Sequence, residues 1–263
     1  MSGRLAIVAG SGPLPRLVAE AAAAGGRKLF VLGFTGITAP ELPTHRLMPL
    51  GAMSRSLAVL REAGVGEVVL VGPVPRPRLS DLQPDLRAIR LVTRVARGRI
   101  GDDAALRAVI DELESQGHRV VGADAVAPML VTRAGTLGAC RADEASLRDL
   151  PVGLEACRGL GDVGQAVVVR RGEVIGREQR GGTDRLLADI PPGRGGILVK
   201  RTKLAQDRRV DLPTIGPRTV ELAAEAGLRG LFVEADATLL VDRERTRARA
   251  DALGLFIVGV PLR

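Results

Sequence analysis

The 263-residue sequence predicts an α/β protein with two domains: an N-terminal domain built on a parallel sheet and a smaller α+β domain at the C-terminal end. In the first half, short apolar runs alternate with amphipathic helical stretches, which is the pattern of a parallel sheet covered by helices. The second half mixes a hairpin signal with helices instead. Hydrophobic residues make up 46 % of the chain, so both domains can bury a core.

The chain opens with a strand, a glycine turn and a helix. Leu5–Ala9 is an apolar run, and Gly10-Ser11-Gly12-Pro13 leads into an alanine-rich helix that ends near Gly25-Gly26. Backbone N–H groups of Gly10, Ser11 and Gly12, with the positive end of the helix dipole, form a candidate anion site. A dinucleotide fingerprint would need glycine at Pro15 and a carboxylate after Lys28–Leu32, so NAD is discounted.

A third strand, Glu67–Val71, runs directly into a proline-rich loop. The loop, Gly72–Pro77, follows the carboxyl end of the strand, where open α/β sheets bind their ligands. Arg76 is therefore a candidate phosphate contact, and a solvent-facing arginine held between prolines explains it equally well. Helices follow, one of them starting at Gly101, and Arg119–Gly122 predicts the last strand of a domain that covers residues 1–130.

Residues 131–163 are rich in glycine and poor in periodicity, so the sequence predicts a linker there. A second, catalytic domain would then cover residues 164–263. Gln165–Val169, the turn Arg171-Gly172 and the run after it predict a hairpin, and Gly181-Gly182-Thr183-Asp184 begins a short helix.

The best candidate for an active site is Leu198–Val220. Ile197–Val199 predicts a buried strand and Pro217 the first turn of a helix, with a charged loop between them. Of 38 basic residues only three are lysine, and two of these, Lys200 and Lys203, flank this loop. A lysine is a compact mobile charge that suits a phosphate.

Carboxylates and donors share that loop. Asp207 and Asp211 can hold a divalent cation or orient water, while Gln206, Arg208 and Arg209 can donate to anionic oxygens. A solvated charged loop is the common alternative. Asp211 fits that alternative least, because it lies between apolar neighbours in VDLP.

Composition limits the classes of function. The net charge of +8 and the isoelectric point near 10.9 favour anionic partners, yet aromatic residues are only 2 % and stacking platforms for nucleic acid are nearly absent. Cys140 and Cys157 are expected to be free thiols, and His45 and His118 are isolated. The free thiols fit a reducing cytoplasm. The apolar runs are shorter than the ~20 residues of a membrane span, so the protein is expected to be soluble, or at most to sit on a membrane face.

Several motifs together resemble one family, the LpxI-type UDP-2,3-diacylglucosamine pyrophosphatases of lipid A biosynthesis. In chain order these motifs are LAIVAGSGPLP, GDDAALRAVIDELESQG followed by VVGAD, GDVGQAVVV, GGTD and QDRRVDLPTIGPRTVELAAEAG. The last is long and specific, and the others are individually weak. The resemblance implies a Rossmann-like N-terminal domain, a C-terminal domain of the family's own type, and a homodimer.

The resemblance also implies an activity: Mg²⁺- or Mn²⁺-dependent hydrolysis of UDP-2,3-diacylglucosamine to 2,3-diacylglucosamine 1-phosphate (lipid X) and UMP, with peripheral contact to the inner face of the inner membrane. Asp211 matches the family's important aspartate and would be the catalytic residue and a metal ligand, assisted by Asp207. The residues expected to bind substrate or phosphate are Gly10, Ser11, Gly12, Arg76, Gln165, Thr183, Asp184, Lys200, Lys203, Gln206 and Arg209.

The chain departs from the family pattern in three places. Leu204-Ala205 replaces a proline after Lys203, Gly181 replaces a glutamate, and Gly72–Pro77 lacks an asparagine and a serine. These departures affect details of substrate contact and leave Asp211 in place. Two alternatives to the enzyme stay open: a non-catalytic nucleotide or nucleotide-sugar binding protein that uses the Gly10–Pro13 loop, and, more remotely, a nucleic-acid-binding module.

Overall fold

A computed structural model describes residues 3–74, 83–97, 102–161, 164–179, 181–191, 193, 195–203, 207–209 and 211–262. The chain divides into two units. The first comprises Met1–Met129 together with Asp207–Asp211, and the second comprises Leu130–Gln206 and Leu212–Arg263. Five residues of the predicted active-site loop thus belong to the unit formed by the first half of the chain.

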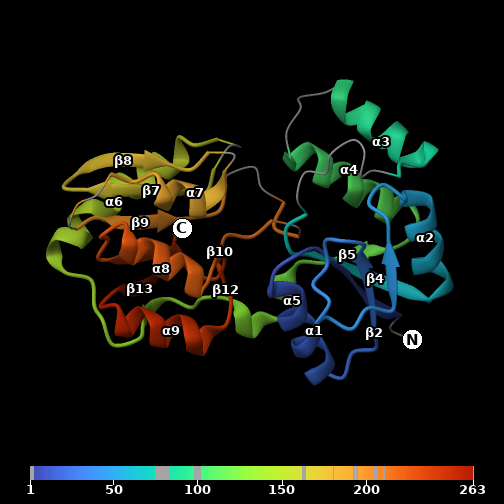
Figure 1. The fold of residues 1–263 in the computed structure, drawn as a ribbon, viewed down its shortest axis with the longest axis horizontal. Helices are drawn as coiled ribbons and strands as arrows, with labels where there is room; N and C mark the ends of the chain where they lie inside the picture. The colour runs from blue at the N-terminus through green and yellow to red at the C-terminus, as the bar shows by residue number, and fades with distance from the viewer. Residues whose placement is uncertain are drawn as a thin grey trace. The chain divides into compact units, whose positions relative to one another are not determined.

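The first unit is a parallel sheet covered by helices, as predicted (Figure 1). Its elements are β1 (Arg4–Ala9), α1 (Leu14–Ala24), β2 (Leu29–Phe34), β3 (Arg46–Met48), α2 (Met53–Glu62), β4 (Val65–Val71), α3 (Leu86–Arg97), α4 (Asp102–Ser115), β5 (Arg119–Val120) and α5 (Ala123–Val126). All pairings in the order β3-β2-β1-β4-β5 are parallel, with Leu5 opposite Leu29 and Glu67.

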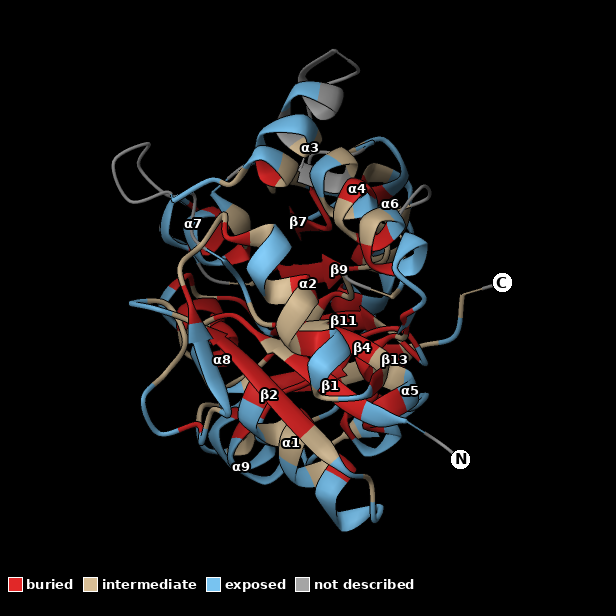
Figure 2. Cartoon of the chain, turned by 90° about the vertical axis from the view of Figure 1, so that its right-hand side faces the viewer, coloured by how far each residue is buried: buried red, intermediate tan, exposed pale blue. Residues whose placement is uncertain are grey.

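The core of this unit forms because its strands are apolar on both faces, as strands of a covered parallel sheet are. Figure 2 shows buried residues along β1, β2 and β4. Ala6, Leu32 and Val68 pack with Leu60 of α2 and Ile110 of α4. Helix α1 packs against β1, β2 and β4, and α5 packs against α1 and β4. The carboxyl ends of β1 and β4 therefore carry the two loops that the sequence singled out, Gly10–Pro13 and the turn that starts at Gly72.

The second unit is built on a six-stranded mixed sheet, in the order β6-β13-β11-β9-β7-β8. Its elements are β6 (Gly135–Leu137), α6 (Glu144–Arg158), β7 (Ala166–Arg170), β8 (Glu173–Arg177), α7 (Gly182–Ala188), β9 (Ile197–Lys200), β10 (Thr214–Ile215), α8 (Pro217–Glu225), β11 (Gly230–Glu234), β12 (Leu239–Leu240), α9 (Arg243–Ala252) and β13 (Phe256–Val260); η2 (Pro128–Leu130) precedes them at the boundary between the units. Strands β9, β11 and β13 are parallel, whereas β6, β7 and β8 pair antiparallel, and β10 pairs with β12 in a separate small sheet.

Helices cover both faces of that sheet (Figure 1). Helices α7, α8 and α9 share one core with the sheet, which includes Leu187, Leu198 and Leu231. Helix α6 covers the other face, where Val167, Val199 and Phe232 are buried. The β7–β8 hairpin is confirmed, with positive φ at Arg171 (54°) and Gly172 (78°), as a two-residue turn requires.

The prediction of a linker over residues 131–163 is wrong. This segment contributes β6 to the edge of the sheet and α6 to one face. A Cβ on Gly153 would lie 2.4 Å from Cγ2 of Val199, so this glycine allows the helix to approach the sheet closely. The buried carboxylate of Asp149 accepts hydrogen bonds from the N–H groups of Arg171 (3.1 Å) and Gly172 (2.6 Å) at the hairpin turn. Gly153 therefore marks close packing of a helix on the sheet. The two units are comparable in length.

Candidate active site

In the second unit, polar side chains meet at the carboxyl end of β9. All four residues of β9 are buried, including Lys200, which is 7 % exposed. Its Nζ donates hydrogen bonds to Oγ1 of Thr183 (2.7 Å) and to the carbonyl of Thr214 (3.0 Å). Oγ1 of Thr183 donates in turn to Oε2 of Glu178 (2.8 Å). A buried ammonium is tolerated when it is hydrogen-bonded, and here it joins β9 to α7 and β10.

Other predicted residues lie around that junction. Gln165 is buried immediately before β7, and its carbonyl accepts a hydrogen bond from the N–H of Arg201 (2.9 Å). Asp184 is exposed in the first turn of α7, and Lys203 is half-buried beyond β9. The carboxyl end of a parallel strand is where α/β sheets bind ligands, so these residues are at a suitable edge of the second unit.

In the first unit, Asp207 and Arg209 form a charged pair within the segment Asp207–Asp211. The Nε and Nη2 atoms of Arg209 lie 2.9 and 2.7 Å from the Oδ1 and Oδ2 atoms of Asp207, and the N–H of Arg209 donates to Oδ1 as well (3.0 Å). Hydrogen bonds from Arg209 lower the pKa of the Asp207 carboxyl, although partial burial opposes the shift. Both oxygens of Asp207 are therefore engaged by one arginine.

Asp211 closes the same segment. Its backbone N–H donates to the carbonyl of Asp207 (3.2 Å), and the residue is half-buried. This hydrogen bond joins the backbone of Asp211 to that of Asp207, so the position of Asp211 depends on how Asp207 is held. Leu212 and Pro213 then return the chain to the second unit.

The Gly10–Pro13 loop of the first unit is tightly packed against the turn that follows β4. The N–H of Gly10 donates to the carbonyl of Val71 (2.8 Å), and both the N–H and Oγ of Ser11 donate to the carbonyl of Pro73 (2.9 Å each). A Cβ on Gly10 would lie 2.3 Å from the carbonyl oxygen of Gly72, so only glycine fits there. The predicted anion donors of Gly10 and Ser11 are thus used to join two loops, while Gly12, at φ 78°, forms the turn into α1.

Two of the predicted site residues, Arg76 and Gln206, lie outside the described residues. Within the described part of the chain, the side chains include no group of three His, Cys, Asp or Glu residues that could hold a metal ion.

Comparison with known proteins matches both halves of the chain to one family. Residues 4–130 match the LpxI N-terminal domain, and residues 133–258 match the LpxI C-terminal domain. The chain belongs to the LpxI family. The resemblance seen in the sequence is thereby confirmed, and the match to the C-terminal domain includes the segment with Asp211.

A relative within the LpxI family supports the same assignment. The UDP-2,3-diacylglucosamine pyrophosphatase LpxI of Caulobacter vibrioides (strain ATCC 19089 / CIP 103742 / CB 15) is 37 % identical over 272 residues, covering 98 % of this chain and 97 % of the relative. Among solved structures, glycinamide-RNase-transformylase T from Mycobacterium tuberculosis covers 65 % of this chain and 43 % of its own at 16 % identity. Its TM-score of 0.23 carries no argument about fold or function.

The sequence did not indicate the acidic partners of Thr183 and Arg209 in this LpxI chain. Glu178 accepts from Thr183, and Glu114 lies 2.7 Å from Nη1 of Arg209. A signal existed for Glu114: it lies in the last turn of α4, which contains no basic residue although the negative end of a helix dipole favours one. Nothing in the sequence around Glu178 indicates its partner.

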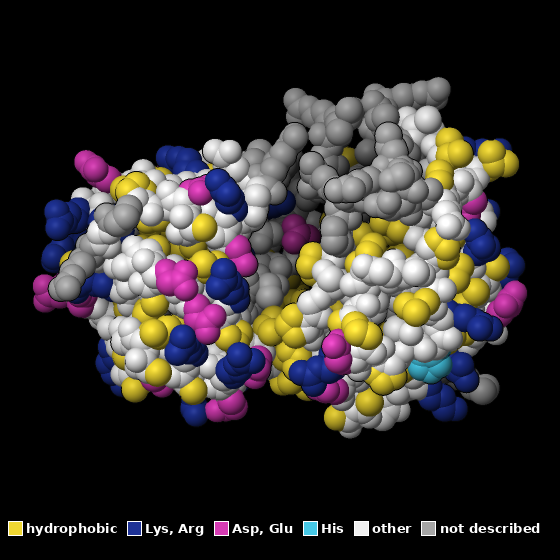
Figure 3. Space-filling view, in the orientation of Figure 1, with side chains coloured by type: hydrophobic (Ala, Val, Ile, Leu, Met, Phe, Trp, Pro, Cys, Tyr) yellow, Lys and Arg dark blue, Asp and Glu magenta, His cyan; other side chains and the backbone are white. Residues whose placement is uncertain are grey.

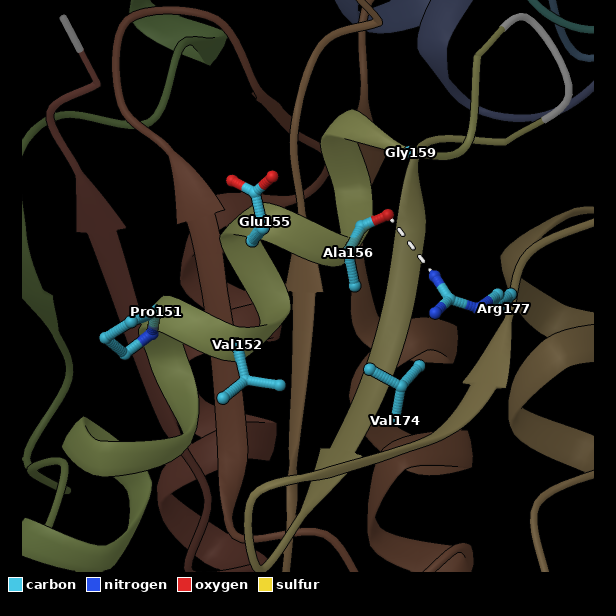
Figure 4. A pocket seen from close by; sticks show the side chains of 7 residues that line it. All are labelled: Pro151, Val152, Glu155, Ala156, Gly159, Val174 and Arg177. Atoms are coloured by element: carbon cyan, nitrogen blue, oxygen red, sulfur yellow. Dashed lines mark hydrogen bonds between the residues drawn. The ribbon is translucent and has the colours of Figure 1, made fainter.

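A pocket of about 790 Å³ lies elsewhere in the second unit, between α6 and β8. Figure 4 shows Val152 and Val174 in it, with Arg177 donating to the carbonyl of Ala156 (3.4 Å). Its lining consists of Pro151, Val152, Glu155, Ala156, Gly159, Val174 and Arg177. The predicted site residues that the structure describes do not line this pocket, so it is not part of the candidate active site.

Charge is mixed on the surface. On the face shown in Figure 3, Lys and Arg side chains are interspersed with Asp and Glu rather than gathered into one stripe. None of the helices within the described residues is long and apolar enough to cross a membrane.

Proposed function

We propose that the chain hydrolyses the pyrophosphate of UDP-2,3-diacylglucosamine, releasing 2,3-diacylglucosamine 1-phosphate and UMP. The proposal rests on the similarity of the chain to LpxI proteins over nearly its whole length. Both LpxI domains match, and the relative named as UDP-2,3-diacylglucosamine pyrophosphatase is 37 % identical over 98 % of this sequence.

The geometry of the Asp207–Asp211 segment supports a division of roles between its two aspartates. Both oxygens of Asp207 are held by Arg209, which makes Asp207 a poor candidate for the reacting group. We therefore assign to Asp211 the role of orienting the attacking water or holding a metal. Hydrolysis of a diphosphate needs an aligned water and neutralisation of the phosphate oxygens, and a carboxylate suits the first task.

We propose that Mg²⁺ or Mn²⁺ binds at Asp211 together with the phosphate oxygens of the substrate. Mg²⁺ is commonly held by one or two carboxylates together with substrate phosphates and water. Asp211 would hold it, and the bound ion would neutralise charge on the diphosphate. Lys203 and Asp184 remain proposed substrate contacts, since both lie near the carboxyl end of β9.

Lys200 takes a different part in this proposal. Its ammonium is hydrogen-bonded to Thr183 and Thr214 inside the second unit. We assign it to holding the start of the loop, where the chain leaves β9 for Asp207–Asp211. Thr183 acts with it, so both are positioning residues.

We also propose a homodimer and transient contact with an anionic membrane surface, where the diacyl substrate would reside. The net charge of +8 supports such contact, because basic side chains are attracted to anionic lipid. Light scattering at micromolar concentration tests the dimer. Flotation with vesicles that contain or lack anionic lipid tests the membrane contact, which should weaken as salt is raised.

The deciding experiment incubates the purified chain with UDP-2,3-diacylglucosamine and Mg²⁺ and follows products by phosphorus NMR and mass spectrometry. Release of UMP with the lipid phosphate supports hydrolysis. The same reaction in ¹⁸O-labelled water identifies the phosphorus that is attacked, because one product carries the label. Stoichiometric binding of the intact nucleotide sugar without release of UMP would overturn the proposal and favour the non-catalytic binding protein.

A further inference from the structure

Glu114 and Arg209 are 95 residues apart in sequence and form an ion pair in the first unit. Oε1 of Glu114 lies 2.7 Å from Nη1 of Arg209. Glu114 is in the last turn of α4, where a carboxylate faces the negative end of the helix dipole. This unfavourable placement is offset by the guanidinium that the Asp207–Asp211 segment supplies.

The same guanidinium is held from its other side by Asp207. Nε and Nη2 of Arg209 contact the two oxygens of Asp207 in a fork, a geometry that fixes direction as well as distance. Arg107, two helical turns before Glu114 on α4, adds positive charge near Asp207 and lowers the pKa of its carboxyl further. Helix α4 thus presents charges complementary to those of the segment.

A second contact holds the middle of the segment. Nη2 of Arg208 lies 3.7 Å from Oδ2 of Asp124, which belongs to α5. A Cβ on Gly122 would lie 3.2 Å from the carbonyl oxygen of Arg208, so backbone also approaches backbone here. The segment is therefore fixed against two elements of the first unit before the chain reaches Asp211.

We infer that Glu114, Arg209 and Asp207 form a clasp that positions Asp211. The connection runs through the backbone, since the N–H of Asp211 donates to the carbonyl of Asp207 (3.2 Å). The clasp replaces the roles expected from the sequence, in which Arg209 contacts phosphate and Asp207 holds metal. Glu114 and Arg209 are positioning residues; the effect on turnover rests on the proposed function, whereas the effect on loop order does not.

Because the clasp is partly exposed, its effect on the position of Asp211 can be measured apart from its effect on global stability. The side chains of Glu114 and Arg209 are 41 % and 40 % exposed, and ion pairs in such places contribute little to global stability. A small displacement of a reacting group can nevertheless lower a rate about 100-fold. Loss of the clasp should therefore change turnover and local order while the melting temperature stays nearly constant.

Glu114→Gln tests the clasp, and Glu112→Gln is its matched control. Glu112 is on the same helix and pairs with Arg87 of α3 at 3.0 Å instead of contacting the loop. Hydrogen exchange of peptides covering residues 207–211 is measured first, because it needs no substrate. We expect exchange in Glu114→Gln to accelerate roughly tenfold, and exchange in Glu112→Gln to match that of the wild type.

Turnover is measured next, with kcat and KM separated. We expect Glu114→Gln to lower kcat by about tenfold with KM nearly unchanged, because the reacting group is displaced while substrate contacts remain. In a protein that already carries Arg209→Gln, adding Glu114→Gln should lower kcat little further, since each change breaks the same ion pair.

The outcomes separate the two proposals. Normal loop exchange in Glu114→Gln would overturn the clasp, whether or not the wild type is active. An inactive wild type with faster loop exchange in Glu114→Gln would overturn the proposed hydrolysis and leave the clasp standing. Fast exchange with unchanged kcat and KM would show that the clasp orders the loop without positioning Asp211 for the reaction, which contradicts the inference.

Discussion

The ammonium of Lys200 donates a hydrogen bond to the hydroxyl of Thr183 across 2.7 Å, and that hydroxyl donates to Glu178 across 2.8 Å. This buried chain joins the end of β9 to the first turn of α7. A lysine that the sequence offers as a phosphate ligand is thus part of the internal structure of the second unit.

Removing the hydroxyl of Thr183 should destabilise the protein. Thr183→Val keeps the shape of the side chain and leaves the buried ammonium of Lys200 without one acceptor. We expect the free energy of unfolding in urea to fall by about 1–3 kcal/mol. Thr183→Ser retains the hydroxyl and is the control, with a smaller loss expected. Equal stability of the two variants would show that the hydrogen bond contributes little.

Asp211→Asn should remove most of the activity without unfolding the protein. If the carboxylate orients water or holds a metal, its loss should lower kcat/KM by more than about 100-fold. Release of UMP gives the rate, and circular dichroism with a melting curve shows that the variant is folded. A variant that keeps most of its turnover would reduce Asp211 to a turn residue.

Metal binding should depend on the nucleotide. With Asp211 as the protein ligand and phosphate oxygens completing the coordination, Mn²⁺ should bind the protein weakly alone and more tightly with UDP. Electron paramagnetic resonance of free Mn²⁺ measures both affinities without turnover. In Asp211→Asn the UDP-dependent increase should disappear. An increase that persists in this variant would place the metal elsewhere.

The Asp207 carboxyl should titrate below its ordinary pKa of 3.8, because hydrogen bonds from Arg209 favour its charged form. For a depressed pKa, the ion pair contributes stability above pH 3.8, and this contribution is lost as the pH falls through the folded-state value. Carboxyl-carbon NMR measures the midpoint directly. Arg209→Gln should move the midpoint upward, and an unchanged midpoint would show that Arg209 is not the cause.

The two cysteines should differ sharply in reactivity. Burial raises the pKa of the Cys157 thiol to about 12, and its Sγ lies 3.5 Å from the carbonyl of Val199. Cys140 is also a free thiol and is only half-buried. Because the thiolate is the reactive form, a disulfide reagent at pH 8 should modify Cys140 first and reach Cys157 only after denaturation. In the folded Cys140→Ser variant the remaining thiol is Cys157. Its rapid reaction with the reagent would contradict this assignment.

Much of the fold follows from local patterns in the sequence. Continuous apolar runs predicted β1, β4 and β9, and the turn at Arg171-Gly172 predicted the β7–β8 hairpin. These predictions succeed because strand burial and turn geometry depend on residues close together in the chain. The linker prediction failed for the same reason: a glycine such as Gly153 looks alike in sequence whether it lies in a loop or allows a helix to pack on Val199.

By itself, the sequence determined the family, the order of most elements and the importance of the segment around Asp211, since these depend on linear motifs and apolar periodicity. Only the tertiary structure decided what the charged residues do. Lys200 meets Thr183 from 17 residues away, and Arg209 meets Glu114 from 95 residues away. A charge has many possible partners along a chain, and folding selects among them by bringing distant side chains within hydrogen-bonding distance.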